Sequence, residues 1–485
     1  MQKWLFTWSR VSDKIRDVKV CLIIYGLYIT REGEMPVKDS FRGGVHPKGL
    51  KDPQSKRPLR VYEAVGDIVL PLSQHIGKPA KPIVKKGDPV LTGQLIAEAD
   101  GFISANVISS CSGKVKAIEK RRTIAGTMQE CIVIENDGQF TETGSFGKRE
   151  DYSGFSRDEI IARVKAAGIV GLGGAGFPTH VKLAPKEPDK IKYVIANGAE
   201  CEPCLTGNDR LMRERPEEIV EGLRIILSLF PNAEGVIAVE KNKPEAIEAM
   251  RKASEGEERI RVLPLKTKYP QGGERSLISV IAGVDFPITA LPADVGCIVD
   301  NVGTIYAVQR AVAFNEPLFR CVLTVSGDAV KEPANLIVRN GTSISELLEA
   351  CGGVNDGKTL KKVLAGGPMM GFAFASLDVP AVKTTNGVTA TAEDACEKAE
   401  KQETACLHCG RCTTVCPQGL LPQLMADAVY IGDLERYEKK LYGLECIACG
   451  SCTYVCPAKR PLTQTFKETK AEIMALKRLA AGGKK

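Results

Sequence analysis

Eight cysteines stand in two short blocks near the C-terminal end of the chain, and their spacing suits metal chemistry. The first block, CLHCGRCTTVCP, covers residues 406–417, and the second, CIACGSCTYVCP, covers residues 446–457. Both follow the pattern C-x2-C-x2-C-x3-C-P, in which three closely spaced thiolates wrap one iron–sulfur cube and the fourth reaches a second cube. The blocks therefore predict two [4Fe-4S] clusters that carry electrons.

The same rule assigns the ligands of each cluster, because the fourth cysteine of one block serves the cluster of the other block. The predicted ligands are Cys406, Cys409, Cys412 and Cys456 for one cluster, and Cys446, Cys449, Cys452 and Cys416 for the other. A zinc site is the alternative, but zinc modules usually bring their cysteines as two separated Cys-x-x-Cys pairs. Three ligands in series favour iron and sulfide.

A glycine-rich stretch, GIVGLGGAGFPTHVKL at residues 168–183, is the second candidate for chemistry. Its glycines remove side chains where the backbone must approach a flat or phosphorylated ligand, and Lys182 adds a positive charge for a phosphate. The stretch is neither a GxGxxG fingerprint between a strand and a helix nor a Walker A motif. Two further loops accompany it, ANGAECEPCLTGNDR at 196–210 and YPQGGERSL at 269–277.

These loops need a scaffold, and the hydrophobic pattern around them predicts alternating helices and strands. Ser156 and Glu159 form a capping box before a helix that ends at Gly168. The predicted strands are 191–198, 235–240 and 261–265, and the later helices begin at Pro244 and cover 276–282. This alternation predicts a mostly parallel sheet with ligands at the strand ends.

The regions on either side of this sheet have their own patterns. Residues 60–135 hold short apolar runs broken by glycine and proline, which predict small strands and tight turns and resemble a biotinyl/lipoyl-type barrel-sandwich hybrid. Residues 319–370 predict two strands, a helix capped by Thr342 or Ser343 and a further strand, which fits a small β-grasp domain. A charged connector at 393–401 precedes the cysteine blocks, and the tail after them predicts one amphipathic helix.

The composition excludes several classes of protein. Of 485 residues, 44% are hydrophobic and 26% are charged, which is typical of a globular protein. No apolar run reaches the roughly 18 residues that cross a bilayer, and no basic motif with interleaved aromatic residues predicts nucleic-acid binding, although the net charge is +7. The first 35 residues lack the features of a secretory signal, so the 17 cysteines favour a reducing compartment.

The three loops, in this order and on an α/β scaffold, resemble the flavin- and NADH-binding subunit of respiratory complex I. Together with FRGGVHP at 41–47, the β-grasp pattern and the doubled cysteine motif, the chain over about residues 40–465 resembles the RnfC family, a subunit of the Rnf ion-translocating electron transport complex. The resemblance implies a multidomain α/β fold. The implied parts are an N-terminal extension (1–40), a barrel-sandwich hybrid domain (41–150), an α/β FMN/NADH-binding domain (151–315), an SLBB β-grasp domain (316–380), a two-cluster ferredoxin-like domain (395–465) and a helical tail (466–485).

The resemblance also implies cofactor-binding residues, at positions that match the family's loops. For FMN these are Gly171, Gly173, Gly174 and Lys182 of the stretch at 168–183, called here the glycine loop. Asn197, Glu200 and Cys201 of the loop at 196–210, called here the polar loop, are also implied for FMN. Phe177 and Glu202 match residues near the nicotinamide nucleotide, Gly272, Gly273 and Glu274 match a loop that approaches flavin and NADH, and Asn301 and Thr304 match the segment beside the ribityl phosphate. No side chain is implied as a general acid or base.

The function that the resemblance implies is electron transfer between NAD(H), FMN and two [4Fe-4S] clusters. The chain would be a peripheral subunit at the cytoplasmic face of the cell membrane, in a ferredoxin:NAD oxidoreductase complex that moves Na+ or H+. Its implied partners are the membrane and iron–sulfur subunits of that complex and, through them, ferredoxin. No nucleic acid is implied as a partner.

Three departures from the family patterns and one further resemblance keep alternatives open. The cobalamin reductase of bacterial microcompartments shares the loops and clusters, although FRGGVHP favours the RnfC family. A non-catalytic electron relay is favoured by Leu172, where the complex I subunit has arginine, and by Gly273, where it has an acidic residue. Cys204 stands where the RnfC family has tyrosine, and with Cys201 it forms a C-x-x-C that is a weaker candidate for redox chemistry.

Overall fold

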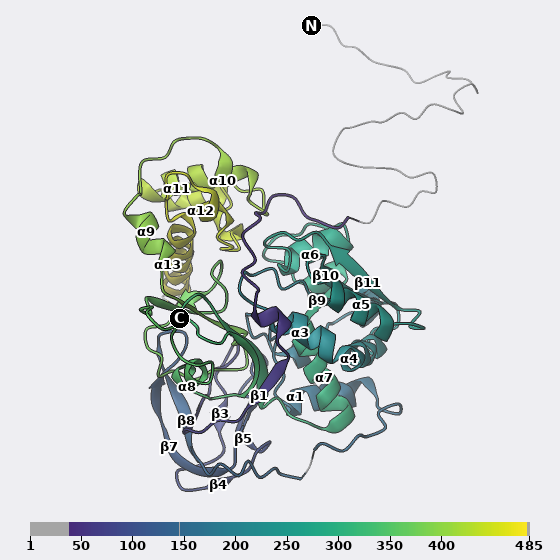
Figure 1. The fold of residues 1–485 in the computed structure, drawn as a ribbon. Helices are drawn as coiled ribbons and strands as arrows, with labels where there is room; N and C mark the ends of the chain where they lie inside the picture. The colour runs from purple at the N-terminus through teal and green to yellow at the C-terminus, as the bar shows by residue number, and fades with distance from the viewer. Residues whose placement is uncertain (1–37, 145, 483–485) are drawn as a thin grey trace, which may run out of the picture. The chain divides into compact units, whose positions relative to one another are not determined.

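The computed structural model describes residues 38–144 and 146–482, and Figure 1 shows how the helices and sheets follow one another along this part of the chain. Most of the predicted N-terminal extension, residues 1–37, lies outside the described residues. The described residues form four sheets, one of them fully parallel. None of the described helices has both the length and the apolar character that crossing a membrane requires.

The parallel sheet carries the loops that the sequence singled out. Its strand order is β11-β10-β9-β12, and every neighbouring pair is parallel. The strands are β9 (Tyr193–Gly198), β10 (Glu234–Glu240), β11 (Ile260–Leu265) and β12 (Cys297–Asn301). Three of them begin within two residues of the predicted starts, so the predicted β-α alternation is confirmed.

Helices cover both faces of this sheet. They are α1 (Arg157–Ala166), α2 (Thr179–Lys182), α3 (Gly207–Glu214), α4 (Pro216–Ser228), α5 (Pro244–Ala253), α6 (Glu274–Ile281) and α7 (Val302–Phe314), with 3-10 turns at Pro188–Lys190 and Pro292–Val295. The predicted capping box is confirmed at the start of α1. The Glu159 N–H donates to Ser156 Oγ over 3.3 Å, and the Ser156 N–H donates to Glu159 Oε2 over 2.7 Å.

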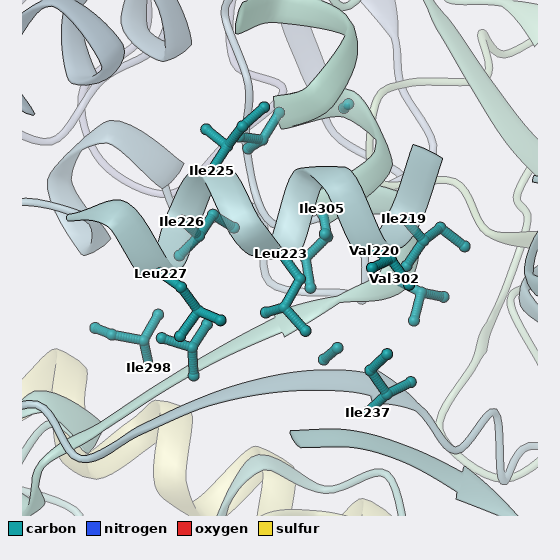
Figure 2. Packing of buried hydrophobic residues seen from close by; sticks show 14 of the residues in the cluster. Ile219, Val220, Leu223, Ile225, Ile226, Leu227, Ile237, Ile298, Val302 and Ile305 are labelled. Carbon is teal, nitrogen blue, oxygen red and sulfur yellow. The ribbon is translucent and has the colours of Figure 1, made fainter. Parts of the chain in front are cut away.

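Two hydrophobic cores form because successive strand side chains point to opposite faces. Val194 of β9 packs in the core with α1, α4, α5 and α7, whereas Ile195 packs in the other core with α6. Figure 2 shows the first core, with the apolar side chains of α4 directed toward α7 and the sheet. A Cβ at Gly222 of α4 would overlap the carbonyl oxygen of Ile305, so α4 and α7 cross closely only because this residue is glycine.

The N-terminal sheets build the barrel-sandwich domain. One sheet has the order β2-β8-β7-β4 and the other β3-β5-β6. The strands are β2 (Ile68–Pro71), β3 (Lys81–Pro82), β4 (Pro89–Val90), β5 (Leu95–Glu98), β6 (Val107–Ile108), β7 (Gly113–Arg122) and β8 (Met128–Asn136). Side chains from both sheets, among them Ile96, Ile132 and Ile134, form one core between them.

The β-grasp region forms a six-stranded sheet of order β1-β14-β13-β17-β15-β16. Its elements are β1 (Leu59–Tyr62), β13 (Arg320–Ser326), β14 (Ala334–Arg339), α8 (Ile344–Glu349), β15 (Lys362–Ala365), β16 (Phe372–Ala373) and β17 (Gly387–Thr391), with a 3-10 turn at Gln54–Lys56. Strand β1 comes from far upstream and pairs in parallel with β14. Ser343 holds the N-cap position of α8, but its hydroxyl contacts Ser345 instead of a helix N–H.

The cysteine blocks lie in a small helical domain. Its elements are α9 (Ala395–Glu400), α10 (Arg411–Thr414), α11 (Pro422–Tyr430), a π-helical turn at Arg436–Lys440, a 3-10 turn at Gly443–Glu445, α12 (Ser451–Val455) and α13 (Leu462–Gly482). Helix α13 is the predicted tail helix. Its Leu462, Phe466 and Ile473 are buried against Met425 and Tyr437, so one face of the tail belongs to the domain core.

Candidate functional site

The structure gathers the eight block cysteines into two groups of four, each around its own small cavity. The first, called here the Cys449 cavity, is lined by Cys416, Cys446, Cys449 and Cys452. The second, called the Cys409 cavity, is lined by Cys406, Cys409, Cys412 and Cys456. Each group combines three cysteines of one block with the fourth cysteine of the other block, which is the arrangement that the spacing rule predicts.

The two blocks have matching backbone conformations at positions forty residues apart. His408 and Ala448 both have positive φ, at 51° and 54°, and so do Gly410 and Gly450, at 73° and 83°. These conformations aim the His408 and Ala448 N–H groups at the sulfurs of Cys406 and Cys446, each over 3.4 Å. Positive φ is uncommon outside glycine, so its repetition indicates a shared requirement to turn N–H groups toward sulfur.

The chemistry of the Cys449 cavity fits a group that binds thiolates. Burial raises the pKa of Cys446 to about 11 and that of Cys452 to about 12, so both favour the protonated thiol when no cation replaces the proton. Among residues 38–144 and 146–482, no three histidine, cysteine or acidic side chains converge tightly enough to hold a single metal ion. Each iron of a [4Fe-4S] cube takes one cysteine thiolate, so the four cysteine sulfurs lie around the cube and do not converge on one point.

The glycine loop, the polar loop and the 269–277 loop enclose one large cavity of about 1070 Å³, called here the loop cavity. It opens at the carboxyl ends of β9 and β12, where ligands of parallel sheets bind. The predicted cofactor-binding residues that line it are Gly171, Gly173, Gly174, Phe177, Lys182, Asn197, Glu200, Cys201, Glu202, Gly272, Gly273, Glu274 and Asn301. Thr304 is the exception, because its hydroxyl lies behind the glycine loop and accepts the Leu172 N–H over 3.0 Å.

The glycine loop presents its backbone to the loop cavity. Its ends are joined by a bridge between Val170 and Pro178 and by the Gly171 N–H, which donates to Phe177 O over 2.9 Å. Within the described residues, the N–H groups of Gly173, Gly174 and Ala175 have no protein acceptor. A run of unpaired backbone donors forms a concave site for an anionic or electron-rich ligand.

Two predicted asparagines hold the loops in place. Asn197 Nδ2 donates to Gly272 O over 2.9 Å, which fastens the polar loop to the 269–277 loop. Asn301 is the N-cap of α7, because its Oδ1 accepts the Gly303 N–H over 2.8 Å. A Cβ at Gly173 would lie 3.3 Å from the Asn301 Cβ, so this glycine allows the glycine loop to pass close to β12.

Two predicted acidic residues also bind backbone groups. Glu200, which has a φ of 47°, accepts the Asn208 N–H at the start of α3 over 2.7 Å. Glu202 accepts the N–H groups of Met369 and Met370, over 3.1 and 2.8 Å, and so joins the polar loop to the β-grasp domain. Burial raises the pKa of Glu202 although these two N–H groups oppose the shift.

The half-buried Lys182 and the fully buried Asp300 form an ion pair in the wall of the loop cavity. Lys182 Nζ lies 2.9 Å from Asp300 Oδ1 and donates to Val299 O over 2.7 Å. Burial opposes the charge of Lys182, but the carboxylates of Asp300 and Glu274 outweigh it and raise the pKa of the lysine. Glu274 lines the cavity, and burial raises the pKa of its carboxyl.

The Cys201 and Cys204 thiols favour the protonated form. Burial raises the pKa of Cys201 to about 12 and that of Cys204 to about 11. Cys201 Sγ accepts the Gly272 N–H over 3.3 Å, so this thiol packs between the two loops. Reactive cysteines have lowered pKa values, and these two do not.

The loop cavity and the Cys449 cavity share a wall. Ile447 lines both of them. Tyr269 lines the loop cavity, is 1% exposed, and donates its O–H to Cys449 O over 2.7 Å. Arg275 of the 269–277 loop also contacts the cysteine domain, because its Nη1 lies 2.9 Å from Glu445 Oε2. The Cys409 cavity shares no lining residue with the loop cavity, and Cys409 itself is exposed.

Residues 41–54, called here the N-terminal strap, bind both the loops and the cysteine domain. The Gly44 N–H donates to Val415 O over 2.8 Å, and Val45 pairs with Tyr269. A Cβ at Gly43 would lie 2.7 Å from Cys416 O, so the strap passes directly against a cysteine of the Cys449 cavity. The sequence alone suggested no physical role for this FRGGVHP stretch.

Lys51 of the strap is a site residue that the sequence did not predict. Its ammonium donates to Glu200 O and Glu202 O, each over 3.0 Å, and it thereby gathers the turns of the polar loop. Burial lowers the pKa of Lys51. Lys51 lies about 150 residues from that loop in the chain, and no local pattern marks it; Tyr269, by contrast, stood within a loop already singled out.

Four family models match the chain, in the order that the sequence predicted. The RnfC barrel sandwich hybrid domain matches residues 39–139, the Nuo51 FMN-binding domain residues 164–310, the SLBB domain residues 322–373 and the 4Fe-4S dicluster domain residues 398–457. The predicted multidomain architecture is confirmed.

Three curated proteins are similar to nearly the whole chain. The C subunit of the proton-translocating ferredoxin:NAD(+) oxidoreductase complex of Clostridium ljungdahlii is 43% identical over 439 residues, which cover 90% of this chain and 94% of that protein. The C subunit of the Na(+)-translocating ferredoxin:NAD(+) oxidoreductase complex of Acetobacterium woodii is 42% identical over 442 residues, with 90% and 98% covered. The C subunit of the ion-translocating oxidoreductase complex of Rhodobacter capsulatus is 43% identical over 439 residues, with 90% and 83% covered.

Proposed function

The chain belongs to the RnfC family, the C subunits of ion-translocating ferredoxin:NAD(+) oxidoreductase complexes, and from that premise we propose that it is the NADH-reacting subunit of such a complex. One observation carries the proposal: a large cavity with unpaired backbone donors shares the Ile447 wall with a cavity of four cysteines. A nucleotide site and an electron carrier are thus neighbours.

Within the loop cavity the residues fit FMN and a nicotinamide nucleotide. Gly173, Gly174 and Ala175 offer unpaired N–H groups, and the glycines leave room for a flat ring to lie against the backbone. Lys182 supplies a charged ammonium in the wall, held by Asp300. Bound FMN supplies the conversion between a two-electron hydride donor and one-electron carriers.

Five of the other predicted site residues are assigned positioning roles. The side chains of Asn197 and Glu202 bond to backbone groups of neighbouring segments. Glu200 and Asn301 accept N–H groups at the starts of α3 and α7, and Thr304 supports the glycine loop from behind. Fixed loops reduce the ordering cost of ligand binding. We assign no general acid or base.

The two cysteine cavities are assigned to [4Fe-4S] clusters with the exchanged ligand sets. The Cys449 cluster is the nearer one to the loop cavity, and the Cys409 cluster is the outer one, with an exposed cysteine. We assign the outer cluster to exchange with the iron–sulfur or membrane subunits of the complex, at the cytoplasmic face of the membrane, and through them with ferredoxin. Those partners would move Na+ or H+.

The proposal is tested by purifying the full chain without oxygen and measuring iron, sulfide, flavin and NADH-dependent bleaching. The expected result is about eight iron atoms and about one FMN per chain, with flavin and clusters both reduced by NADH. Stoichiometric zinc would overturn the cluster assignment. Clusters without flavin absorption would favour the non-catalytic relay, and rapid NADH-dependent reduction of a corrinoid without binding to Rnf subunits would favour the cobalamin reductase.

A further inference from the structure

Two apolar side chains of the barrel-sandwich domain stand at the open end of the loop cavity. Phe102 and Ile76 line this cavity together with the glycine loop, and they are 81% and 47% exposed. The wall of the same cavity also holds Asp300, which is buried, and its ion-pair partner Lys182. The cavity therefore has a polar enclosed end and an apolar open end.

Direct contacts between the two domains fix the position of Ile76. The Ile76 N–H donates to Gly176 O of the glycine loop over 3.2 Å. A Cβ at Gly176 would lie 2.9 Å from Thr384 Cγ2 and 3.2 Å from the His75 Cα, so the glycine loop passes tightly between the two segments. The barrel-sandwich domain thus forms part of the cavity wall.

A second set of contacts fixes the turn that carries Phe102. The Lys78 N–H donates to Ile103 O over 3.0 Å, and Lys78 Nζ lies 2.7 Å from Asp100 Oδ2. His75 Nε2 accepts the Ala105 N–H over 3.1 Å. These bonds hold the turn at residues 100–105 against residues 75–78. Phe102 is therefore an exposed aromatic ring on a preorganised support, which lowers the cost of ordering it on a ligand.

The size and chemistry of the cavity call for a second planar group at the open end. Its volume of about 1070 Å³ lies at the upper limit of ordinary ligand pockets, which span about 300–1,000 Å³. Aromatic side chains recognise purine and pyrimidine bases by stacking on their faces. Lys186 also lines this cavity and has no ion-pair partner among the described residues, so a free cation is available for a phosphate.

We propose that Phe102 stacks on the adenine ring of NAD(H), with Ile76 beside it, so that the barrel-sandwich domain supplies the adenine subsite of the loop cavity. This inference rests on the proposed function. The nicotinamide must reach the flavin among the glycine and polar loops, so the ring at the open end belongs to the other half of the dinucleotide. Lys186 then meets the linking phosphates.

The test compares NADH with reduced nicotinamide mononucleotide, which lacks the adenosine half. The full chain loaded with FMN and clusters is assayed for ferricyanide reduction. Phe102→Ala is expected to raise the KM for NADH about tenfold, which corresponds to about 1.4 kcal/mol, and to leave kcat and FMN content unchanged. The KM for the mononucleotide is expected to stay constant, and Phe102→Trp is expected to restore the KM for NADH.

The control is Ile83→Ala, which removes another exposed apolar side chain of the same domain that does not line the loop cavity. It is expected to leave both KM values unchanged. If Phe102→Ala does not change the KM for NADH, or changes it equally for the mononucleotide, the adenine subsite is refuted while the proposed function stands. A wild-type chain that retains FMN but neither binds nor oxidises NADH refutes the proposed function and the inference together.

Discussion

At the scale of single residues, Glu202 connects two domains through one carboxylate. Its oxygens accept the N–H groups of Met369 and Met370, which lie in the β-grasp domain, while its own backbone belongs to the polar loop. A Cβ at Gly367 would overlap this side chain, so the glycine leaves the space in which the carboxylate sits. The resemblance placed Glu202 near the nicotinamide, and the geometry supports a role in holding the loop.

Replacing Glu202 with alanine leaves two backbone donors without their acceptor. The free energy of unfolding is expected to fall by about 1–3 kcal/mol, the cost of unpaired polar groups. Urea denaturation of the loaded chain measures it. Glu258→Ala is the matched control, because Glu258 is an exposed acid with no partner among the described residues, and a change within about 0.5 kcal/mol is expected. An unchanged stability with a raised KM for NADH would instead show a direct contact with the nucleotide.

Lys383 joins three parts of the chain from a fully buried position. Its ammonium donates to Asn106 O in the barrel-sandwich domain and to Gly168 O before the glycine loop, each over 2.6 Å. Its N–H donates to Gln74 Oε1 over 3.2 Å. Burial lowers the pKa of Lys383 from 10.5 to about 7. No acidic side chain of the described residues compensates the charge of Lys383, so the contribution of this lysine to stability depends on pH.

The stability of the chain is therefore expected to rise with pH above about 7. Between the lowered pKa in the folded chain and 10.5 in the unfolded chain, the unfolded chain binds more protons, so the free energy of unfolding increases by up to about 1.4 kcal/mol per pH unit. Below about 7 both states hold the proton and the slope disappears. Urea titrations of wild type and Lys383→Met from pH 6 to 10 isolate this contribution, because other groups cancel in the difference. Parallel pH profiles would show that Lys383 is not the source.

At the scale of elements, the two cysteine blocks are equivalent turns followed by equivalent short helices. Gly410 and Gly450, with positive φ, precede α10 and α12, and Thr413 and Thr453 contact Gln423 and Thr463 at the next helix in each block. This symmetry places the fourth cysteine of each block at the cavity of the other. The proposed exchange of ligands follows from the duplication.

Paired substitutions distinguish exchanged from unexchanged ligands. Cys409→Ala with Cys456→Ala removes two ligands of the same cavity, so the chain is expected to keep about four iron atoms. Cys409→Ala with Cys416→Ala removes one ligand from each cavity and is expected to impair both clusters. Iron and sulfide analysis, with electron paramagnetic resonance after dithionite reduction, measures the outcome.

The unexchanged arrangement predicts the reverse, since Cys409 and Cys416 belong to the same block and Cys456 to the other. Cys396→Ala is the control for loss of a cysteine as such, because Cys396 is exposed and lies outside both cavities. This variant is expected to keep the full iron content. An equal iron content in the two paired variants would refute both ligand assignments.

Elements that local sequence defines were predictable, and elements that distant pairing defines were not. Strand β10 has the run Val-Ile-Ala-Val between polar ends, and α1 carries its own capping box, so both stood out. Strand β1 has two exposed residues among its four and exists because it pairs with β14, nearly 300 residues away. Strand β12, with only three apolar residues before Asp300, was also missed.

The same division applies to the candidate site. Cysteine spacing predicted both groups of four cysteines, because three members of each group stand in one short block and the repeated motif supplies the fourth. The glycine-rich sequence likewise placed the cavity wall. The ammonium of Lys51 bonds to the polar loop from the N-terminal strap, and Phe102 lines the loop cavity from the barrel-sandwich domain; only the folded chain reveals these positions. Local patterns identify ligands, whereas the supports of the site depend on tertiary structure.

At the scale of the whole molecule, the order of the cavities supports the proposed path for electrons. The loop cavity borders the Cys449 cavity through Ile447, and the two cysteine cavities share the small domain that ends in α13. Exposed side chains gather near the Cys409 cavity, including Leu407 at 62% exposure. The proposed Cys449 cluster would thus lie between the proposed nucleotide site and the proposed outer cluster.

This order predicts that the two clusters act in series. In a chain with Cys409→Ala and Cys456→Ala, NADH is expected to reduce the remaining Cys449 cluster. In a chain with Cys416→Ala and Cys449→Ala, the remaining Cys409 cluster is expected to stay oxidised during NADH turnover, although dithionite reduces it, because its neighbour in the path is missing. Rapid mixing with NADH, followed by freezing and electron paramagnetic resonance, separates the two cases.

Each variant serves as the control for the other, since each loses two cysteines and one cluster but only one loses the inner cluster. Equal rates of cluster reduction by NADH in both variants would show that the outer cluster receives electrons without the inner one, and the serial path would be wrong.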